Sequence, residues 1–494
     1  MMKVFQWIKR VSAFRWLMLA FVVKLLLLLL FTSALKPLHD FKLFNEGGDT
    51  YSYYPPIESF VDGNGYGSAC RMPGLLPVYA PLYYCLGKEP AREVIVVLQF
   101  LLSVISVYVL AIIAQRIFRS RAAFVIAFLL YAISSFVSLW DLFGMADSFS
   151  TSFIIFSVYF FLSYLERRAW KAMFWSGIFI AWAIFLRPIS GLLLPLGAVF
   201  ILLDAFQHKH AFRKTLGIGL LFLTPFMGCE SAWIARNFSK EHAFIPLQDA
   251  QENCFGWSAY AKPMAAIRSL LIDWGENMVY WESPTAEFFE NAYHHNQDPR
   301  NFNPFKASRF FSSAYNLDSL LVLRANYLLA KDPSVGDSMH QLYSARVIRS
   351  ANAFRQSYRY EHPWLTHVVN PNRLLLKCLF RSGFPKWRPL DAFVKMNVVY
   401  RSLFKCFVLL FNLMSFLGLA GLLLVCYKKQ VLPMLVGIIP LAFLVVLVYL
   451  LGWIELRYLV PVYPFLVLFA AYVLALLTKP LQRFVPLAFM KQLK

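Results

Sequence analysis

The chain has 494 residues, of which 59% are hydrophobic and only 15% are charged. Soluble domains carry about a quarter of charged residues, so this composition excludes an ordinary soluble enzyme and indicates a polytopic membrane protein. The formal net charge of +21 does not indicate nucleic-acid binding, because the basic residues fall largely in short loops between apolar segments, where they act as topology signals and lipid-headgroup contacts.

A membrane-spanning helix needs about 20 mostly apolar residues. The sequence contains ten such segments, at residues 12–35, 92–115, 122–140, 148–165, 172–186, 189–206, 215–235, 400–427, 431–452 and 458–478. If the N-terminus is cytoplasmic, the basic clusters that flank these segments all fall on the cytoplasmic side, as the positive-inside rule requires. We therefore predict an all-α polytopic membrane protein with ten spans and both termini in the cytoplasm.

The spans divide the chain into three predicted regions. Residues 1–235 hold the first seven spans and a first outer loop, 36–91, in which we place the catalytic chemistry. Residues 236–398 are less apolar and long enough for a core of their own, and we predict a mostly helical extracytoplasmic domain there. Residues 399–494 hold the last three spans.

The first outer loop is polar, aromatic and rich in turn-forming residues. Asp49 follows Gly47-Gly48, where the backbone can turn tightly and approach a ligand. Tyr51 and Tyr54 follow it and can stack on sugar rings, and Arg71 lies further along. The alternative interpretation is an ordinary structured loop in which glycine and proline serve only as turns.

Other conspicuous polar residues fall at span ends on the same predicted outer side. They are Asp141, Asp147, Arg187, Arg236, Glu455, Arg457 and Tyr458. Ionisable groups near a bilayer are costly and usually functional. A carboxylate can act as general base toward a hydroxyl acceptor, and arginines can neutralise a departing phosphate.

Each of these residues also has a purely structural interpretation. Asp141 and Asp147 can cap the fourth helix, Arg71 and Arg187 can anchor the chain at the headgroups, and Glu455 and Arg457 can pair with each other. Cys70 and Cys85 can form a disulfide if both face an oxidising compartment. No cofactor is required by the sequence; it holds no carboxylate cluster that demands a divalent metal, so metal dependence stays open.

Five stretches of the sequence resemble the GT-C superfamily of membrane glycosyltransferases, in particular its bacterial protein mannosyltransferase-like and lipid A aminoarabinose transferase-like branch. They are GGDTYSYY with RMPGLLPVYAPLYY, DLFGMADSFSTS, LRPISGLLLPL, WIARNFSKEHAFIPLQ and WIELRYLVPVYPFLVLFAA. They occur in the family's order and cover about the whole membrane part. The domain at 260–398 does not match, and where some relatives have lysine or a His-Pro-Pro motif this chain has Arg71-Met72-Pro73-Gly74.

The resemblance implies a GT-C-like bundle and a polyprenyl-phosphate-sugar donor that enters from the bilayer. The family's acid in the first outer loop maps onto Asp49, and its second acid onto Asp147 or Asp141. Its basic residues around the donor phosphate map onto Arg71, Arg236 and Arg457, with Arg187 as a further candidate. Direct attack by the acceptor would invert the anomeric centre.

We therefore predict a glycosyltransferase at the outer face of the cytoplasmic (inner) membrane. It moves a sugar from a polyprenyl-phosphate carrier to a glycolipid, glycan or protein acceptor, it contacts membrane lipids, and it has no nucleic-acid partner. The alternative is a transporter or flippase, or a polymerase or ligase, for lipid-linked sugars. The clustering of charges at one face, rather than at mid-membrane depth, favours an enzyme over a transporter.

Overall fold

The structure is a computed structural model, and nearly all of its regular structure is helical. It describes residues 12–39, 43–46, 50–67, 70–209, 211–248, 261–275, 285–290, 297–332, 334–380, 398–451 and 456–483. These ranges contain no β-strand, and one isolated parallel bridge joins Asn45 to Phe143. The predicted all-α fold is confirmed.

Seven helices in the described ranges are long and apolar enough to cross a membrane. They are α2 (Ala13–His39, of which Ala13–Ser33 qualifies), α5 (Lys88–Phe118), α8 (Asp147–Arg167), the segment Pro188–Gln207 that ends with α10 (Leu193–Gln207), α11 (Phe212–Glu241), α18 (Val398–Tyr427) and the segment Val431–Leu450 that begins with α19 (Val431–Val445). Three shorter apolar segments accompany them, namely α6 (Arg121–Ala132), α9 (Trp170–Leu186) and Tyr463–Thr478, the first part of α20 (Tyr463–Arg483). Each coincides with one predicted span, which confirms a multi-pass membrane protein; the orientation of the spans stays a prediction.

The third predicted span is not one continuous helix. Helix α6 ends at Ala132, and a short helix α7 (Ser135–Trp140) begins after Ser134, whose backbone is extended. Serine is favoured at helix starts, but the side chain of Ser134 forms no cap hydrogen bond here. Every residue of α7 is buried. The second outer loop, which begins at Asp141, therefore starts inside the helical bundle.

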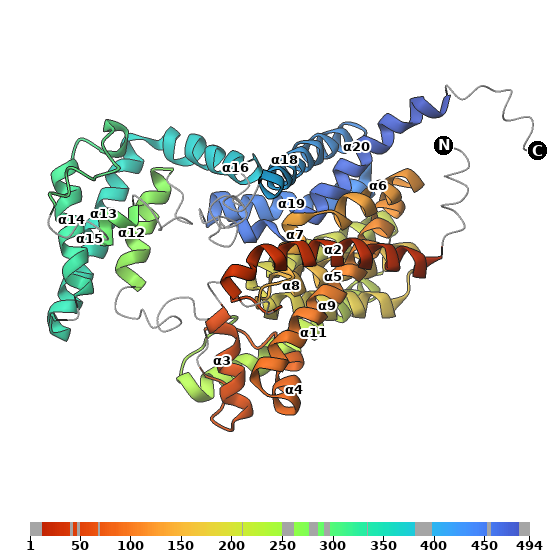
Figure 1. The fold of residues 1–494 in the computed structure, drawn as a ribbon, viewed down its shortest axis with the longest axis horizontal. Coiled ribbons are helices and arrows are strands. Elements are labelled where there is room, and N and C mark those ends of the chain that lie inside the picture. Colours follow the sequence, from red (N-terminus) through yellow and green to blue (C-terminus); the bar gives the residue numbers. More distant parts are fainter. Residues whose placement is uncertain are drawn as a thin grey trace, which may run out of the picture. The chain divides into compact units, whose positions relative to one another are not determined.

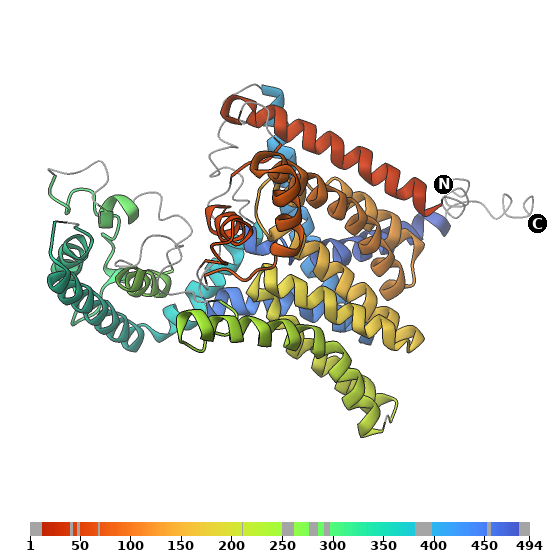
Figure 2. The same ribbon diagram turned by 90° about the horizontal axis from the view of Figure 1, so that it is seen from below.

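Small residues allow the spanning helices to approach closely, as is usual for helices in membranes. A Cβ added at Gly421 of α18 would lie 2.3 Å from the carbonyl oxygen of Phe469 in α20. A Cβ at Gly177 of α9 would lie 2.3 Å from the carbonyl oxygen of Phe222 in α11. Helix α2 packs along α5, as both ribbon views show (Figures 1 and 2).

The first outer loop contains two helices where the sequence indicated turns. Helix α3 (Thr50–Val61) includes two prolines, and α4 (Leu76–Leu86) begins next to Pro77. Tyr54, Ile57 and Glu58 are buried, which is the spacing of one helix face. The frequent proline and glycine in this stretch concealed that spacing.

The chain divides into two compact units. Unit 1 comprises residues 1–248, 382–443 and 459–494, and unit 2 comprises 249–381 and 444–458. Unit 2 contains α12 (Ala261–Asp273), α13 (Thr285–Glu290), α14 (Leu317–Lys331), α15 (Asp337–Glu361) and α16 (Asn370–Phe380). The division at 235 and 398 predicted from the sequence stays a prediction.

An aromatic cluster forms the core of unit 2. Trp274 is 2% exposed, and its ring lies 5.1 Å from Phe305, 5.4 Å from Phe310 and 5.5 Å from Phe354 between centroids. Beside it, Asp273 accepts hydrogen bonds from Arg355 Nε at 2.7 Å and Arg359 Nε at 2.6 Å. Burial of large aromatic rings is a strong source of stability, so this unit has its own core.

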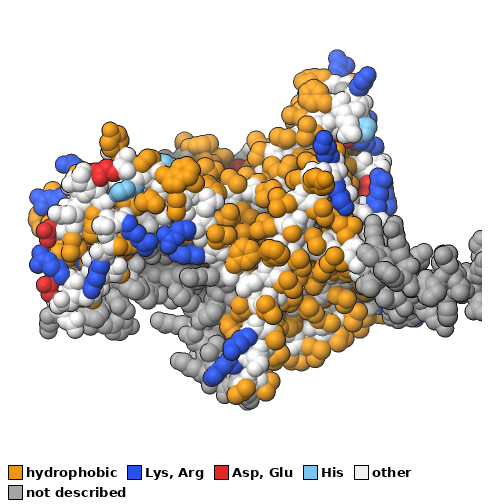
Figure 3. Space-filling model, turned by 90° about the horizontal axis from the view of Figure 1, so that it is seen from above, with side chains coloured by type: hydrophobic (Ala, Val, Ile, Leu, Met, Phe, Trp, Pro, Cys, Tyr) orange, Lys and Arg blue, Asp and Glu red, His pale blue; other side chains and the backbone are white. Residues whose placement is uncertain are grey.

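Hydrophobic side chains also cover much of the surface of the helical bundle. Figure 3 shows a wide apolar area on one face, with Lys and Arg gathered toward its ends. Soluble monomers rarely expose apolar patches larger than a few hundred Å². The surface therefore agrees with a bundle that is solvated by lipid.

Candidate active site

The first and second outer loops are hydrogen-bonded to each other in unit 1. The N–H of Asn45 donates to Leu142 O at 3.1 Å, and the N–H of Gly144 donates to Asn45 O at 3.0 Å. Thr50 Oγ1 donates to Gly144 O at 3.1 Å. Asp49 itself lies outside the described residues, as do its neighbours at 47 and 48. Residues on both sides of that segment are thus attached to residues 142–144.

This crossing requires a glycine at position 144. A Cβ there would lie 2.2 Å from two carbons of the Phe44 ring and 3.1 Å from the hydroxyl of Tyr54. Such contacts are far shorter than van der Waals distances, so a larger residue would push the two loops apart. The carboxylate of Glu93 on α5 holds the same segment by accepting the N–H groups of Leu43 at 3.0 Å and Phe44 at 3.2 Å.

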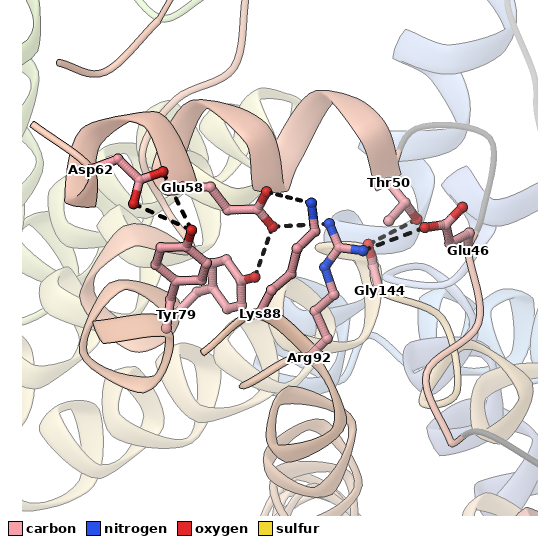
Figure 4. A network of polar contacts seen from close by, with 9 residues as sticks. Glu46, Thr50, Glu58, Asp62, Tyr79, Lys88, Arg92 and Gly144 are labelled. Atoms are coloured by element: carbon pink, nitrogen blue, oxygen red, sulfur yellow. Dashed lines mark hydrogen bonds and ion pairs between the residues drawn. The ribbon is translucent and has the colours of Figure 1, made fainter. Parts of the chain in front are cut away.

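A second polar network braces the helices of the first outer loop (Figure 4). Glu58 of α3 accepts hydrogen bonds from Tyr79 Oη and Arg92 Nη2, both at 2.9 Å, and pairs with Lys88 Nζ at 3.0 Å. Arg92 also reaches Glu46 at 3.5 Å. Burial alone would raise the pKa of Glu58, but Lys88, Tyr79 and Arg92 together lower it, so this carboxylate stays ionised and serves as a brace.

Asp147 and Arg187 form a buried ion pair between the start of α8 and the end of α9. Asp147 is 3% exposed and Arg187 is 8% exposed. Arg187 has an extended backbone (φ −146°, ψ 101°) directly before Pro188, as expected for a residue that precedes proline. Asp147 is the first residue of α8, and no side-chain cap is formed there. The sequence predicted both residues, and the structure brings them together.

Asp141 is occupied by a different partner. Its Oδ2 lies 2.9 Å from Lys24 Nζ of α2, and its Oδ1 accepts a hydrogen bond from Ser148 Oγ at 2.5 Å. Asp141 is 1% exposed. Because both carboxylate oxygens are engaged and the residue is almost fully buried, this arrangement does not favour Asp141 as the base.

Arg71 and Arg236 both lie against Tyr66 of the first outer loop. Arg71 is half-buried, with its Nε donating to Ser52 Oγ at 2.9 Å and its guanidinium 4.7 Å from the Tyr53 ring centroid. Arg236 donates to the carbonyl oxygens of Tyr66 and Gly67. Tyr66 Oη donates to Arg71 O at 3.2 Å. The two predicted phosphate ligands are therefore gathered at the same loop.

The remaining predicted site residues are Tyr54, Tyr51, Glu455, Arg457 and Tyr458. Tyr54 is fully buried, between Phe44 and Tyr79 at centroid distances of 5.4 and 4.7 Å, so it is a core residue and not an open platform for a sugar. The side chain of Tyr51 and all of Glu455 lie outside the described residues. In unit 2, the Arg457 guanidinium lies 5.5 Å from the Tyr458 ring centroid.

The structure does not contain the disulfide between Cys70 and Cys85 that the sequence suggested. Cys70 is disulfide-bonded, whereas Cys85 is a free, exposed thiol on α4. The Cys70–Cys85 disulfide considered from the sequence is therefore wrong. Among the described residues, no group of three or more His, Cys, Asp or Glu side chains is placed to hold a metal ion.

Comparison with known proteins gives one family match. The model of the dolichyl-phosphate-mannose-protein mannosyltransferase family matches residues 75–228. Over this segment, less than a third of its length, the chain is similar to that family. The resemblance predicted from the sequence is thereby confirmed, and with it the enzyme class, a glycosyltransferase that uses a polyprenyl-phosphate sugar. The matched segment contains Asp141, Asp147 and Arg187 but begins after Asp49 and Arg71.

The solved structure of ArnT from Cupriavidus metallidurans in the apo state is similar at 14% sequence identity, with 93% of this chain and 78% of that chain covered and a TM-score of 0.34. A likeness at this level carries no argument. No curated protein sequence matches the chain at a significant level.

Proposed function

We propose that this protein transfers one sugar from a polyprenyl-phosphate carrier to a hydroxyl acceptor at the outer face of the cytoplasmic membrane. The observation that supports it best is the attachment of Asn45 and Thr50, on either side of Asp49, to the loop between Asp141 and Asp147. Both described neighbours of the segment that contains Asp49 are thus bound to residues 142–144 of the second outer loop.

The proposed chemistry is a single displacement. Asp49 takes the proton of the acceptor hydroxyl, the acceptor oxygen bonds to the anomeric carbon, and the bond from that carbon to the phosphate oxygen breaks. The configuration at the anomeric carbon is inverted. The polyprenyl phosphate leaves with developing negative charge, which arginine side chains stabilise. Arg71, half-buried in the first outer loop, is our first candidate for that contact, followed by Arg236, Arg457 and Arg187.

The apolar tail of the donor needs an apolar surface within the bilayer. Unit 1 has a small cavity of about 50 Å³ that is lined by mostly apolar residues of α8, α9, α10, α11 and α19. Ser157, on its wall in α8, is ten residues after Asp147, or about 15 Å along a helix with a rise of 1.5 Å per residue. This spacing suits a ligand whose head lies at the helix start and whose tail contacts the bundle near this small cavity.

The donor is tested with purified protein in lipid nanodiscs. We expect sugar transfer from a polyprenyl-phosphate sugar and none from the corresponding nucleotide sugar. Arg71→Met removes a charge-assisted phosphate contact, which costs about 1.5–3 kcal/mol, or roughly ten- to a hundredfold in donor affinity or rate. Arg213→Met, at an exposed position of α11 on the opposite predicted side, is the matched control. Turnover with a nucleotide sugar alone would refute the proposal.

The outer location is tested by topology mapping. Reporter fusions after residues 120, 170, 210 and 429 are expected to report cytoplasm, and a fusion after residue 300 the outer side, because the basic loops lie inside in the predicted orientation. The disulfide at Cys70 supports an oxidising compartment for the first outer loop. A cytoplasmic signal at residue 300 would contradict the model.

A transporter or flippase of lipid-linked sugars is the second candidate, since it would bind the same donor phosphate. The buried Lys24–Asp141 pair is the one observation that favours it, because charges within a span often mark a transport path. The nanodisc experiment separates the two candidates: a transporter would move the donor between leaflets without releasing sugar to an acceptor.

A further inference from the structure

Lys24 is a charged residue within an apolar span. It lies on α2, whose window Ala13–Ser33 is strongly apolar and only 28% buried, yet Lys24 itself is 1% exposed. Its Nζ donates to Ser103 Oγ, to Ser138 Oγ at 3.1 Å and to Asp141 Oδ2 at 2.9 Å. An ammonium group has three N–H donors, and these three oxygens use all of them.

The start of the second outer loop is held by more than this pair. Gln99 of α5, fully buried, donates its amide to the carbonyl oxygens of Asp141 and Phe143, both at 3.0 Å. Ser148 of α8 donates to the other carboxylate oxygen of Asp141. Side chains from α2, α5 and α8 thus converge on the backbone and side chain of a single loop residue, Asp141.

Stability alone is a poor explanation for this arrangement. A buried ion pair is costly to desolvate, and well-packed apolar residues often stabilise as much or more. Ionisable residues within a span are functional by default. The loop that the pair fixes is the one whose residues 142–144 bind Asn45 and Thr50, on either side of Asp49. The pair therefore acts on the position of the first outer loop.

We propose that Lys24 and Asp141 are positioning residues for the transfer reaction. Lys24 binds Asp141, Asp141 belongs to the second outer loop, and that loop binds Asn45 and Thr50, the described residues on either side of Asp49. This inference rests on the proposed function, in which Asp49 is the base. Loss of the pair should misplace the base without removing any group that touches the donor, so turnover should fall while the KM for the donor changes little.

The test combines kinetics with hydrogen exchange. In Lys24→Met, we expect turnover at saturating substrates to fall by about tenfold or more, since small misplacements of catalytic groups are costly. The KM for the donor should stay within about threefold, or less than about 1 kcal/mol. The amides of Asn45 and Gly144, which bridge the loops, should exchange faster, because their hydrogen bonds open more often.

Leu28→Ala is the matched control, since it shortens another buried side chain of α2 without removing a charge; there, exchange at these two amides should be unchanged. If Lys24→Met does not fold, the double variant Lys24→Met/Asp141→Asn is measured instead, because it leaves no unpaired buried charge. We expect the same fall in turnover and the same faster exchange. Turnover within about threefold of wild type, or a loss of turnover with unchanged exchange at both amides, would overturn the proposal. Hydrogen exchange can be measured whether or not the protein transfers sugar. A wild-type protein that transfers no sugar would therefore refute the proposed function, independently of the exchange result.

Discussion

Replacement of Asp49 by asparagine is expected to lower turnover by about 10²–10⁴-fold, the usual contribution of a general base. Asparagine has nearly the same shape but cannot accept the proton of the acceptor hydroxyl. Thr50, the next residue, is buried and hydrogen-bonded to Gly144 O. We therefore expect the backbone at Thr50 to keep its conformation in the variant. Turnover in nanodiscs, beside donor binding and thermal unfolding of the same variant, is the measurement.

Glu46→Gln is the matched control for this variant. Glu46 is an acid three residues earlier with a side chain that is 70% exposed, and its contact with Arg92 is 3.5 Å long. Exposed pairs contribute little, so its replacement should leave turnover within about threefold of wild type. If Asp49→Asn behaved like Glu46→Gln, Asp49 would not be the base, and Asp147 would be tested next.

The membrane part of the fold could be predicted because the physics of a span is local. A stretch of about 20 apolar residues has few alternatives to a helix in lipid, and every predicted span coincides with an apolar helix. Interruptions within a span are harder to predict. The break between α6 and α7 lies at Ile133 and Ser134. The sequence around these residues is still apolar enough for a continuous membrane-spanning helix.

The first outer loop shows where local patterns mislead. Proline and glycine indicated turns, yet residues 50–61 and 76–86 are helices, because tertiary burial of Tyr54, Ile57 and Tyr79 outweighs weak local preference. The Glu58–Arg92 brace was also missed. Its only signal was the spacing of Lys88 and Arg92, which places two cations on one helix face without naming their partner.

The candidate site was predicted as a set of residues but not as a set of pairs. Asp147 and Arg187 were chosen separately for their place at span ends, and their pairing depends on how α8 packs on α9. Lys24 was overlooked because one lysine hardly alters the hydropathy of its span, and its partner Asp141 is 117 residues away. Sequence spacing carries no information about contacts at that separation.

Replacement of Arg187 by methionine should give the largest loss of stability among single changes at this site. Asp147 would be left as a buried, unpaired charge, and breaking a buried ion pair from one side costs about 3–5 kcal/mol. Methionine fills a similar volume, so lost packing contributes little. The free energy of unfolding, measured by denaturant titration in detergent micelles, is the quantity to compare with wild type.

The double variant Asp147→Asn/Arg187→Met separates charge from function. It leaves no unpaired charge, so we expect it to regain most of the lost stability, because two residues of one ion pair are strongly coupled. Turnover should not recover with it if Arg187 also contacts the donor phosphate. A double variant as unstable as Arg187→Met would show that the cost comes from packing around Pro188, and the ion pair would then have no special part in holding α8 against α9.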